Sequence, residues 1–374
     1  MKRRLILILT VTIVLLSAGC LERHLENDYS RDMKGCCGND NKINTPAGLI
    51  EYLNQQNLPA LQSAELWQSR FTEGLKLTTA HYEIYTTLFD PLMLRDIPAF
   101  METCYHSYQK QLPKPVETET KFAVYLFSNR TQWEIYTVFF TAEQAPEYTQ
   151  IKAGAYYHNG SCIAYNIGRE RTFRVLGHEC WHQFADRLFK YRLPSWLNEG
   201  IAMQFEANRY ENGLFYFEPE RNLYRLGSLK KTLDANYKIA LQELIAADPG
   251  QVFEQGTVFV SAFYSQSYAL VRFLKQGCNG KYKDNLKKML EDALKGGWTL
   301  NATNAMIASD RRIPLTVGWN QAVGPDLFKQ YVETDFEKIE NEFADFCTKI
   351  VQNVKLKPIL IEQDYTPQTE KTAN

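Results

Sequence analysis

Histidine and cysteine are scarce in this sequence, and a strong excess of either charge is missing. The 374 residues include six His, eight Cys, 42 Lys and Arg, and 43 Asp and Glu, which give a formal net charge of −1. A chain without a basic excess lacks the electrostatic attraction that nucleic-acid-binding proteins use, which argues against a nucleic-acid partner. No C-x-x-C pair, internal repeat, P-loop or dinucleotide fingerprint is present, which argues against the classes that those patterns mark.

Long apolar runs are also rare, and the N-terminal one is short. Basic residues Lys2–Arg4 precede an apolar stretch at Leu5–Leu16, which is too short to span a bilayer well and is typical of a signal peptide. The following LSAGC, ending at Cys20, resembles a bacterial lipobox, in which cleavage leaves a lipidated N-terminal cysteine. An ordinary secretory signal is the alternative. We expect an exported protein, lipid-anchored through Cys20 to a bacterial cell membrane on its periplasmic or cell-surface side.

The rest of the sequence has the composition of a folded protein. Removal of residues 1–19 takes three of the 42 basic residues and none of the 43 acidic ones, so the remaining chain has a net charge of −4. With 22 Tyr and 21 Phe, that chain can bury a sizeable core. The expected division is a signal peptide at 1–19, a polar tether at 20–45, a domain at 46–356 with lobes at about 46–190 and 191–356, and a tail at 357–374.

The cysteine count is odd once Cys20 is set aside. Seven cysteines remain beyond it. Export permits disulfides, but an odd number leaves at least one thiol free or intermolecular. Cys180 lies on the apolar stripe of a predicted helix, so we expect it to be buried and free.

The most informative stretch, Arg169–Glu206, contains an H-E-x-x-H motif. His178 and His182 are four residues apart, so a helix places both imidazoles on one face, about one turn apart. Glu199 follows within PSWLNEG (Pro194–Gly200), where Pro and Ser mark the start of a second helix, and it can return to a shared metal ion. Apolar residues recur at helical spacing on the first helix and can seat it against a core: Phe173, Leu176, Cys180, Phe184 and Leu188.

These residue types suit a catalytic zinc ion. Two imidazoles and one carboxylate, from His178, His182 and Glu199, fill three corners of a tetrahedron and leave the fourth for water. Zinc lowers the pKa of that water toward about 7. Glu179 is not a ligand in this scheme, so it can accept the water's proton and pass it to a leaving amine. The alternative is an accidental motif of ordinary histidines, which is disfavoured because motif, helical context and third carboxylate agree.

The same residues carry a resemblance to a known family. HECWH followed by WLNEGIA (Trp196–Ala202) resembles the gluzincin metallopeptidases, most closely the peptidase MA-like families of bacterial proteins. The resemblance implies that His178, His182 and Glu199 bind one Zn²⁺ and that Glu179 is the general base. It also implies a zincin-like α+β fold, with an α/β N-terminal lobe and a mainly helical C-terminal lobe around an active-site cleft.

The group that orients the imidazoles is left open. The N-E-x-x-S-D continuation of the thermolysin type is absent, since Met203 stands where an aspartate partner would be expected. Glu206 follows the third ligand by two turns, and Asp186 follows the second histidine by one. Both are carboxylates, which commonly accept a hydrogen bond from the second ring nitrogen of a metal-binding histidine. The alternative that we favour for each is a solvated or structural carboxylate.

The order of predicted elements supports the α+β class. Before the motif we predict short helices within 46–74, strands at 81–87 and 122–127, helices at 91–111 and 131–140, and a hairpin at 153–165 that turns at Asn159-Gly160. After the motif we predict a loop or hairpin at 208–222 and helices within 223–248, 259–274, 286–294 and 327–351. An α/β lobe therefore precedes the site and a helical lobe follows it.

The hairpin before the motif is a candidate cleft edge. In zincins a strand in this position commonly forms that edge, and a peptide can pair with it by strand addition. Tyr156 and Tyr157 can line the cleft, although a purely structural role in the hairpin is equally open. His158, beside the turn, is expected at the surface and not on the metal.

Tyr264 is a candidate catalytic residue in the predicted helix 259–274. This helix resembles the one that follows the third ligand in aminopeptidase-like gluzincins, where a Tyr at a similar distance donates a hydrogen bond to the tetrahedral oxyanion. The resemblance implies that role for Tyr264. A plain core position is the alternative, and Tyr268 is the second candidate donor.

The sequence thus predicts an exported, membrane-tethered zinc metallopeptidase acting on peptide or protein substrates. A second hypothesis is a catalytically inactive zinc-binding or interaction protein. It is disfavoured because Glu179, which metal binding does not need, is present. A third is a zinc hydrolase of non-peptide amide bonds, such as a cell-wall link, which the motif does not separate from a peptidase because the metal chemistry is the same.

Overall fold

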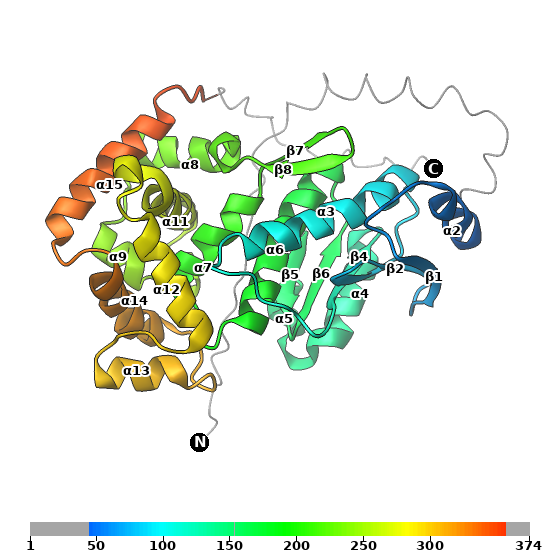
Figure 1. Ribbon diagram of the computed structural model, residues 1–374, viewed down its shortest axis with the longest axis horizontal. Helices are drawn as coiled ribbons and strands as arrows, with labels where there is room; N and C mark the ends of the chain where they lie inside the picture. Colours follow the sequence, from blue (N-terminus) through cyan, green and yellow to red (C-terminus); the bar gives the residue numbers. More distant parts are fainter. Residues whose placement is uncertain (1–44, 153, 357–374) are drawn as a thin grey trace, which may run out of the picture.

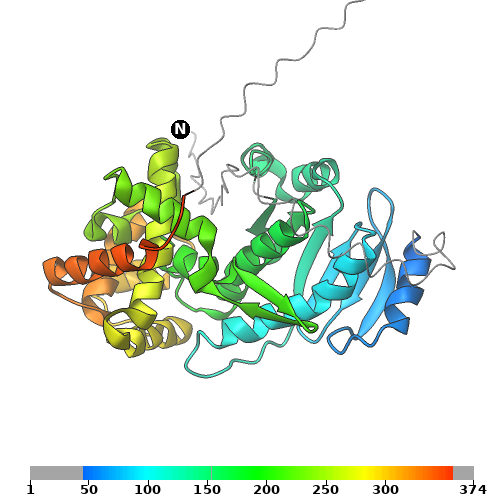
Figure 2. The same ribbon diagram turned by 90° about the horizontal axis from the view of Figure 1, so that it is seen from above.

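A sheet with its covering helices forms the N-terminal part of the molecule, and helices alone form most of the C-terminal part (Figures 1 and 2). This computed structural model describes residues 45–152 and 154–356. The predicted α+β class, with a sheet in the first part and a helical second part, is confirmed. The predicted signal peptide, the lipid site at Cys20 and the tail lie outside the described residues, as does the tether up to residue 44.

One mixed sheet organises the N-terminal part. Its strands are β1 (Ser63–Gln68), β2 (Glu73–Thr78), β3 (Tyr82–Thr86), β4 (Phe122–Phe127), β5 (Ala155–His158) and β6 (Ser161–Tyr165), in the order β1-β2-β3-β4-β6-β5. The pairs β3–β4 and β4–β6 are parallel, and the other three pairs are antiparallel. Parallel neighbours need long crossovers, which explains the helices between these strands. β5 forms one edge of the sheet.

The strands predicted near β3 and β4 and the β5–β6 hairpin are confirmed. In β3 the buried side chains alternate, with Tyr82, Ile84 and Thr86 turned inward. At the hairpin turn, Asn159 and Gly160 have φ values of 43° and 79°. Two consecutive positive φ values match the tight turn that suits the twist of antiparallel strands, so this dipeptide sets the register of the edge strand.

The prediction of short helices throughout 46–74 is only partly right. Helix α2 (Pro46–Gln55) is present, but residues 63–68 and 73–78 form β1 and β2. Leu66, which falls within the predicted helical range, is a strand residue with an exposed side chain. Pairing of β2 with β3 decides the local structure here, because strand formation depends more on neighbours than on intrinsic preference.

Helices cover both faces of the sheet. One face carries α3 (Pro91–Gln109) and α6 (Arg169–Leu188), and the other carries α4 (Arg130–Thr141) and α5 (Ala145–Tyr148). Neighbouring β6 residues show the division. Cys162 joins the main core beneath α6, whereas Ile163 packs with Trp133 of α4 in a separate aromatic cluster. The helix with the H-E-x-x-H motif therefore lies on the core face.

The second part is built around one buried helix. Its helices are α7 (Ser195–Ala202), α8 (Leu223–Asp234), α9 (Leu241–Ala246), α10 (Pro249–Glu254), α11 (Thr257–Gln276), α12 (Lys283–Lys295), α13 (Ala302–Ser309), α14 (Val317–Tyr331) and α15 (Phe336–Val351). α11 packs against α7, α8, α10, α12 and α15. The helices predicted after the motif are thus confirmed, with a break between α14 and α15. None of the helices in the described ranges combines the length and apolarity that a bilayer crossing needs.

A second hairpin follows α7. Its strands β7 (Asn208–Glu211) and β8 (Leu214–Phe217) pair antiparallel, and β8 packs on α3. Figure 2 shows the hairpin reaching from the middle of the molecule over the sheet-containing part. The predicted loop or hairpin at 208–222 therefore contains a hairpin, which packs on α3 of the sheet-containing part.

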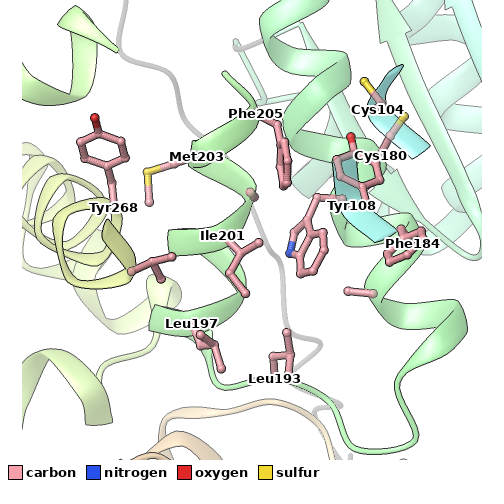
Figure 3. Packing of buried hydrophobic residues seen from close by; sticks show 14 of the residues in the cluster. Cys104, Tyr108, Cys180, Phe184, Leu193, Leu197, Ile201, Met203, Phe205 and Tyr268 are labelled. Carbon is pink, nitrogen blue, oxygen red and sulfur yellow. The ribbon is translucent and has the colours of Figure 1, made fainter. Parts of the chain in front are cut away.

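The chain between the two parts is packed on both sides (Figure 3). The side chain of Met203 points toward Tyr268 of α11, whereas Phe205 points toward Tyr108 of α3. The ring centroids of Phe205 and Tyr108 are 4.6 Å apart. This packing fixes α7 and the turn after it between α11 and the core face of the sheet.

Cys180 is buried and free, as predicted. The other cysteines of the described residues are also free: Cys104, Cys162 and Cys347 are buried, and Cys278 is exposed. The described part of the chain is therefore held together by packing and polar contacts.

Candidate metal centre

Two helices present the predicted ligands. α6 carries both histidines of the motif, and α7 carries Glu199. α7 begins at Ser195 directly after Pro194, as predicted. Oδ1 of Asn320 in α14 accepts a hydrogen bond from the backbone N–H of Ser195 at 2.8 Å. The start of α7 is thus tied to the helical part of the molecule.

The three predicted ligands converge. His178, His182 and Glu199 each offer one atom that could bind a metal ion, and these three atoms all lie within 4.8 Å of one another. Nε2 of His178 is 3.2 Å from Oε2 of Glu199, and Nε2 of His182 is 3.6 Å from Oε1. Within residues 45–152 and 154–356, no other group of three His, Cys, Asp or Glu side chains meets this spacing.

The burial of this group fits a bound metal ion. The exposed fractions of His178, His182 and Glu199 are 1%, 3% and 0%. Both ring nitrogens of His182 and both carboxylate oxygens of Glu199 make no aligned hydrogen bond to any described residue. Buried polar atoms without hydrogen bonds are costly, and one divalent cation would satisfy one ring nitrogen of His182 together with the carboxylate of Glu199. The residues present can therefore hold a metal ion.

The charges at the site are coupled. Burial alone lowers the pKa of His178, but the carboxylates of Glu199 and Glu206 outweigh burial and raise the pKa to about 10. Burial lowers the pKa of His182 to about 4. Burial raises the pKa of Glu199, but the two imidazoles lower it overall. The carboxylates therefore attract one positive charge to this point, and a cation can take the place of the proton.

Glu206 orients His178, a role that the sequence left open. Its Oε1 is 3.0 Å from Nδ1 of His178, and the residue is 4% exposed. A carboxylate at Nδ1 leaves Nε2 directed at Glu199, which is the arrangement found behind metal-binding histidines. Glu206 is therefore not a solvated carboxylate but the buried partner of His178.

Asp186 has other partners. It accepts hydrogen bonds from the Tyr157 hydroxyl at 2.6 Å and from Nη2 of Arg311 at 2.5 Å. These contacts tie the end of α6 to β5 and to the segment after α13. The orienting role considered for Asp186 is therefore wrong, and the structural alternative holds.

Glu179 lies beside the three-ligand group without belonging to it. It is 1% exposed. Burial raises the pKa of both Tyr148 and Tyr264, and the charge of Glu179 contributes to raising both values further. The Glu179 carboxylate is thus within electrostatic range of α5 on one side and α11 on the other.

Tyr264 and Tyr268 of α11 differ in their surroundings. Tyr264 is 2% exposed, and its pKa is raised by burial first and then by the charge of Glu199. The Tyr268 hydroxyl donates to the carbonyl of Pro219 and accepts from Nη1 of Arg272 at 3.0 Å. Tyr268 is therefore a structural residue, and Tyr264 is the remaining candidate donor.

The β5–β6 hairpin forms one edge of the sheet, and none of its residues belongs to the group of candidate ligands. Tyr156 is 1% exposed within the aromatic cluster under α4, so it does not line a cleft. Tyr157 points to the opposite face, where it contacts α6. Nδ1 of His158 is 2.8 Å from the hydroxyl of Tyr148. His158 lies outside the group of three candidate ligands, and it is half-buried, where the sequence analysis expects a surface position.

Two glycines let the ligand helices pack closely. A Cβ on Gly177 of α6 would lie 2.4 Å from the carbonyl oxygen of Phe205. A Cβ on Gly200, next to the third ligand, would lie 2.5 Å from the carbonyl oxygen of Ser267 on α11. Neither position accepts a side chain without movement of backbone, so both close contacts depend on glycine.

Sequence analysis missed Arg225 and Asn222, which both donate hydrogen bonds to Glu206. Neither belongs to the motif. The one available signal was weak: Arg225 and Leu229 are four residues apart, so this arginine lies on the apolar stripe of its helix. A charged residue on an apolar stripe needs a buried partner, but the sequence does not say which.

Comparison of the sequence with known protein families and with curated proteins finds no match. The gluzincin resemblance therefore stays a prediction from the motif. The case for a metal ion at this site rests on the convergence and burial of His178, His182 and Glu199.

Proposed function

We propose that the protein is a zincin-like metallopeptidase of the gluzincin type, which holds one zinc ion through His178, His182 and Glu199 and hydrolyses peptide bonds. The observation that carries this proposal is the buried convergence of the three ligands beside Glu179. Two imidazoles and one carboxylate form a ligand set of zinc hydrolases that leaves one position open. A purely structural zinc site would have closed that position with a fourth protein ligand.

Each residue of the centre has a separate role in this proposal. Zinc, when bound, supplies Lewis acidity, which polarises a substrate carbonyl and lowers the pKa of a water. Glu179 accepts the proton of the attacking water and passes it to the leaving amine. Tyr264 donates a hydrogen bond to the oxygen on which negative charge develops. Glu206 holds Nδ1 of His178, so that Nε2 is directed at the ligand position.

The edge strand β5 offers a place for the substrate. Its outer N–H and C=O groups face no strand of the described sheet, so an extended peptide can pair with them. Gln183, one turn after Glu179, donates to the carbonyl of Gly160 at 2.7 Å and keeps the hairpin beside the motif helix. A peptide paired with β5 would therefore run past α6. This favours a peptide or protein substrate.

We also propose export and a lipid anchor on Cys20, which rest on the sequence alone. The test is metabolic labelling with an alkyne fatty acid. Cys20→Ser should abolish the label, whereas the control Cys278→Ser, at an exposed cysteine, should retain it. A label that persists in Cys20→Ser would remove the anchor from the proposal.

The decisive test of the enzyme is Glu179→Gln. The purified full chain is loaded with zinc and given a peptide library, with and without a chelator, and products are read by mass spectrometry. Glu179→Gln should keep zinc and lose cleavage, because it removes the proton acceptor and no ligand. Glu170→Gln, at an exposed position of the same helix, is the matched control and should retain both.

The other functions give different results in this experiment. An inactive zinc-binding protein would bind zinc and leave the library intact. A hydrolase of non-peptide amides would also leave it intact but would cleave a cell-wall amide in a parallel assay, with the same loss in Glu179→Gln. Cleavage that persists in Glu179→Gln would refute the role assigned to Glu179.

A further inference from the structure

Arg225 is a buried cation next to the candidate metal centre. It lies in the first turn of α8 and is 4% exposed. Its Nε donates to Oε2 of Glu206 at 2.8 Å, and its Nη2 donates to Oε1 at 2.5 Å. Two parallel hydrogen bonds fix both the place and the plane of the carboxylate.

The same carboxylate contacts a predicted zinc ligand. Oε1 of Glu206 is 3.0 Å from Nδ1 of His178. Nδ2 of Asn222 donates to the other oxygen at 3.0 Å. An unbroken line of contacts therefore runs from Arg225 through Glu206 to the imidazole.

Two aromatic rings hold the guanidinium of Arg225. Its Cζ lies 5.1 Å from the ring centroid of Tyr224 and 5.4 Å from that of Tyr264. Cation–π contacts of this kind favour one position of the charge. Since the guanidinium is held on these sides, Glu206 cannot turn away from His178 without losing its paired bonds.

Neither buried charge is stable alone. Glu206 is 4% exposed, and Arg225 provides its paired hydrogen bonds. Removal of one partner of a buried ion pair leaves the other uncompensated. Without Arg225, the carboxylate would turn toward water, and Nδ1 of His178 would lose the contact that orients the ring.

We infer that Arg225 is a positioning residue of the metal centre, which sets zinc affinity by holding Glu206 against Nδ1 of His178. The inference rests on the proposed function, because it needs zinc at the three predicted ligands. Arg225 touches no reacting atom and acts through Glu206. Loss of the partner behind a ligating histidine costs about 10–100-fold in metal affinity, which sets the expected effect.

The test compares zinc affinity in two arginine variants of the full chain, with zinc chloride and a competing chelator. Arg225→Met should weaken zinc binding about 10–100-fold. Arg272→Met is the matched control. Arg272 is also buried, donates to the Tyr268 hydroxyl at 3.0 Å and lies 5.5 Å from that ring's centroid, but it contacts no predicted ligand. The control should leave zinc affinity unchanged.

A double substitution separates positioning from a general loss of fold. Because Arg225 acts through Glu206, Arg225→Met should add no further loss of zinc affinity to Glu206→Gln. Arg225→Lys keeps the charge without the paired bonds and should fall between wild type and Arg225→Met. If Arg225→Met does not fold, the zinc affinities of Arg225→Lys, Glu206→Gln and the variant with both substitutions are compared in the same way. Fully additive losses would overturn the inference.

Failure of the inference and failure of the proposed function are distinguishable. A wild-type chain that binds no zinc ends both. A chain that binds zinc equally well in the wild type, Arg225→Met and Arg272→Met ends the inference alone. Weaker zinc binding in Arg225→Met only, together with an uncleaved peptide library, supports the inference and removes the peptidase assignment.

Discussion

Lys275 is a single side chain whose charge conflicts with its surroundings. Burial lowers its pKa to about 8. Its Nζ donates to Oε1 of Gln111, beyond the end of α3, at 2.5 Å. A neutral amide only partly replaces the water that a charged ammonium group loses. The contact therefore joins the two parts of the molecule, but burial of the Lys275 ammonium group beside a neutral partner is unfavourable.

Removal of this charge should change the pH dependence of stability. The pKa of Lys275 falls from 10.5 to about 8 on folding, so the unfolded chain takes up the proton first and stability declines as pH falls from 10.5 to 8. Lys275→Met lacks this decline and should be about 1–2 kcal/mol more stable at pH 7, after allowance for partial solvent contact. Urea unfolding at pH 7, 8, 9 and 10.5 measures the difference.

The matched control for this pH series is Lys283→Met, at an exposed position of α12. Its difference from wild type should stay constant across the range. For Lys275→Met the difference should shrink toward zero at pH 10.5. If the stability difference between Lys275→Met and wild type did not change with pH, burial would not lower the pKa of Lys275 in the folded protein.

Residues of the site differ in how far the sequence predicts them. His178 and His182 were predictable because their spacing alone places both rings on one helical face. Glu206 was left open because its contact with His178 depends on a turn that bends the chain back after α7. Arg225 gave almost no signal, because its role depends on how α8 docks. Asp186 had a suitable position along the helix but points elsewhere.

At the scale of elements, the close packing of α7 on α11 places the third ligand. A Cβ on Gly200 would lie 2.5 Å from the carbonyl oxygen of Ser267 and 2.5 Å from Cγ2 of Val271. Both atoms belong to α11, whose backbone is buried in the helical part. The helix spacing that positions Glu199 therefore needs a residue without a side chain at this point.

Gly200→Ala should push α7 away from α11 and displace Glu199. We expect a loss of about 1–3 kcal/mol in the free energy of unfolding, as for overpacked cores, together with weaker zinc binding. Urea unfolding and chelator competition measure the two effects. Gly297→Ala is the control, because a Cβ there would meet nothing within 4 Å. Equal zinc affinity in Gly200→Ala and wild type would show that α7 tolerates the shift.

Prediction of elements succeeded where local pattern decides structure. α6 has helical spacing of apolar residues, and the β5–β6 turn has a dipeptide suited to positive φ. It failed at β1, whose residues resemble a helical pattern and become a strand by pairing with β2. The pairing of β1 with its neighbour is not visible in the apolar spacing of β1 alone.

At the scale of the whole molecule, the candidate centre lies where the two parts meet. His178 and His182 come from the sheet-containing part, whereas Glu199 comes from the helical part. The order of elements allowed the class of each part to be predicted. The way in which α7, α8 and α11 dock around the ligands was not predictable, because it depends on packing between segments distant in sequence.

Zinc should therefore stabilise the whole fold. A ligand that binds only the folded state adds about 2.7 kcal/mol to the free energy of unfolding at a free concentration 100 times its Kd. Urea unfolding at buffered zinc concentrations should show this rise in the wild type. His182→Ala should not show it, and His158→Ala, at a half-buried histidine away from the ligands, should show it in full. Stability that does not depend on zinc in the wild type would contradict the proposed centre.

Because the candidate ligands come from both parts of the molecule, the order of synthesis affects when the site can form. A nascent chain presents its two imidazoles before the third carboxylate and the arginine behind it have been synthesised. Tight metal capture must then wait until the second part has folded onto the first. Under the proposed function, the newly made protein would therefore be inactive until that step, and the supply of zinc would then decide when it becomes active.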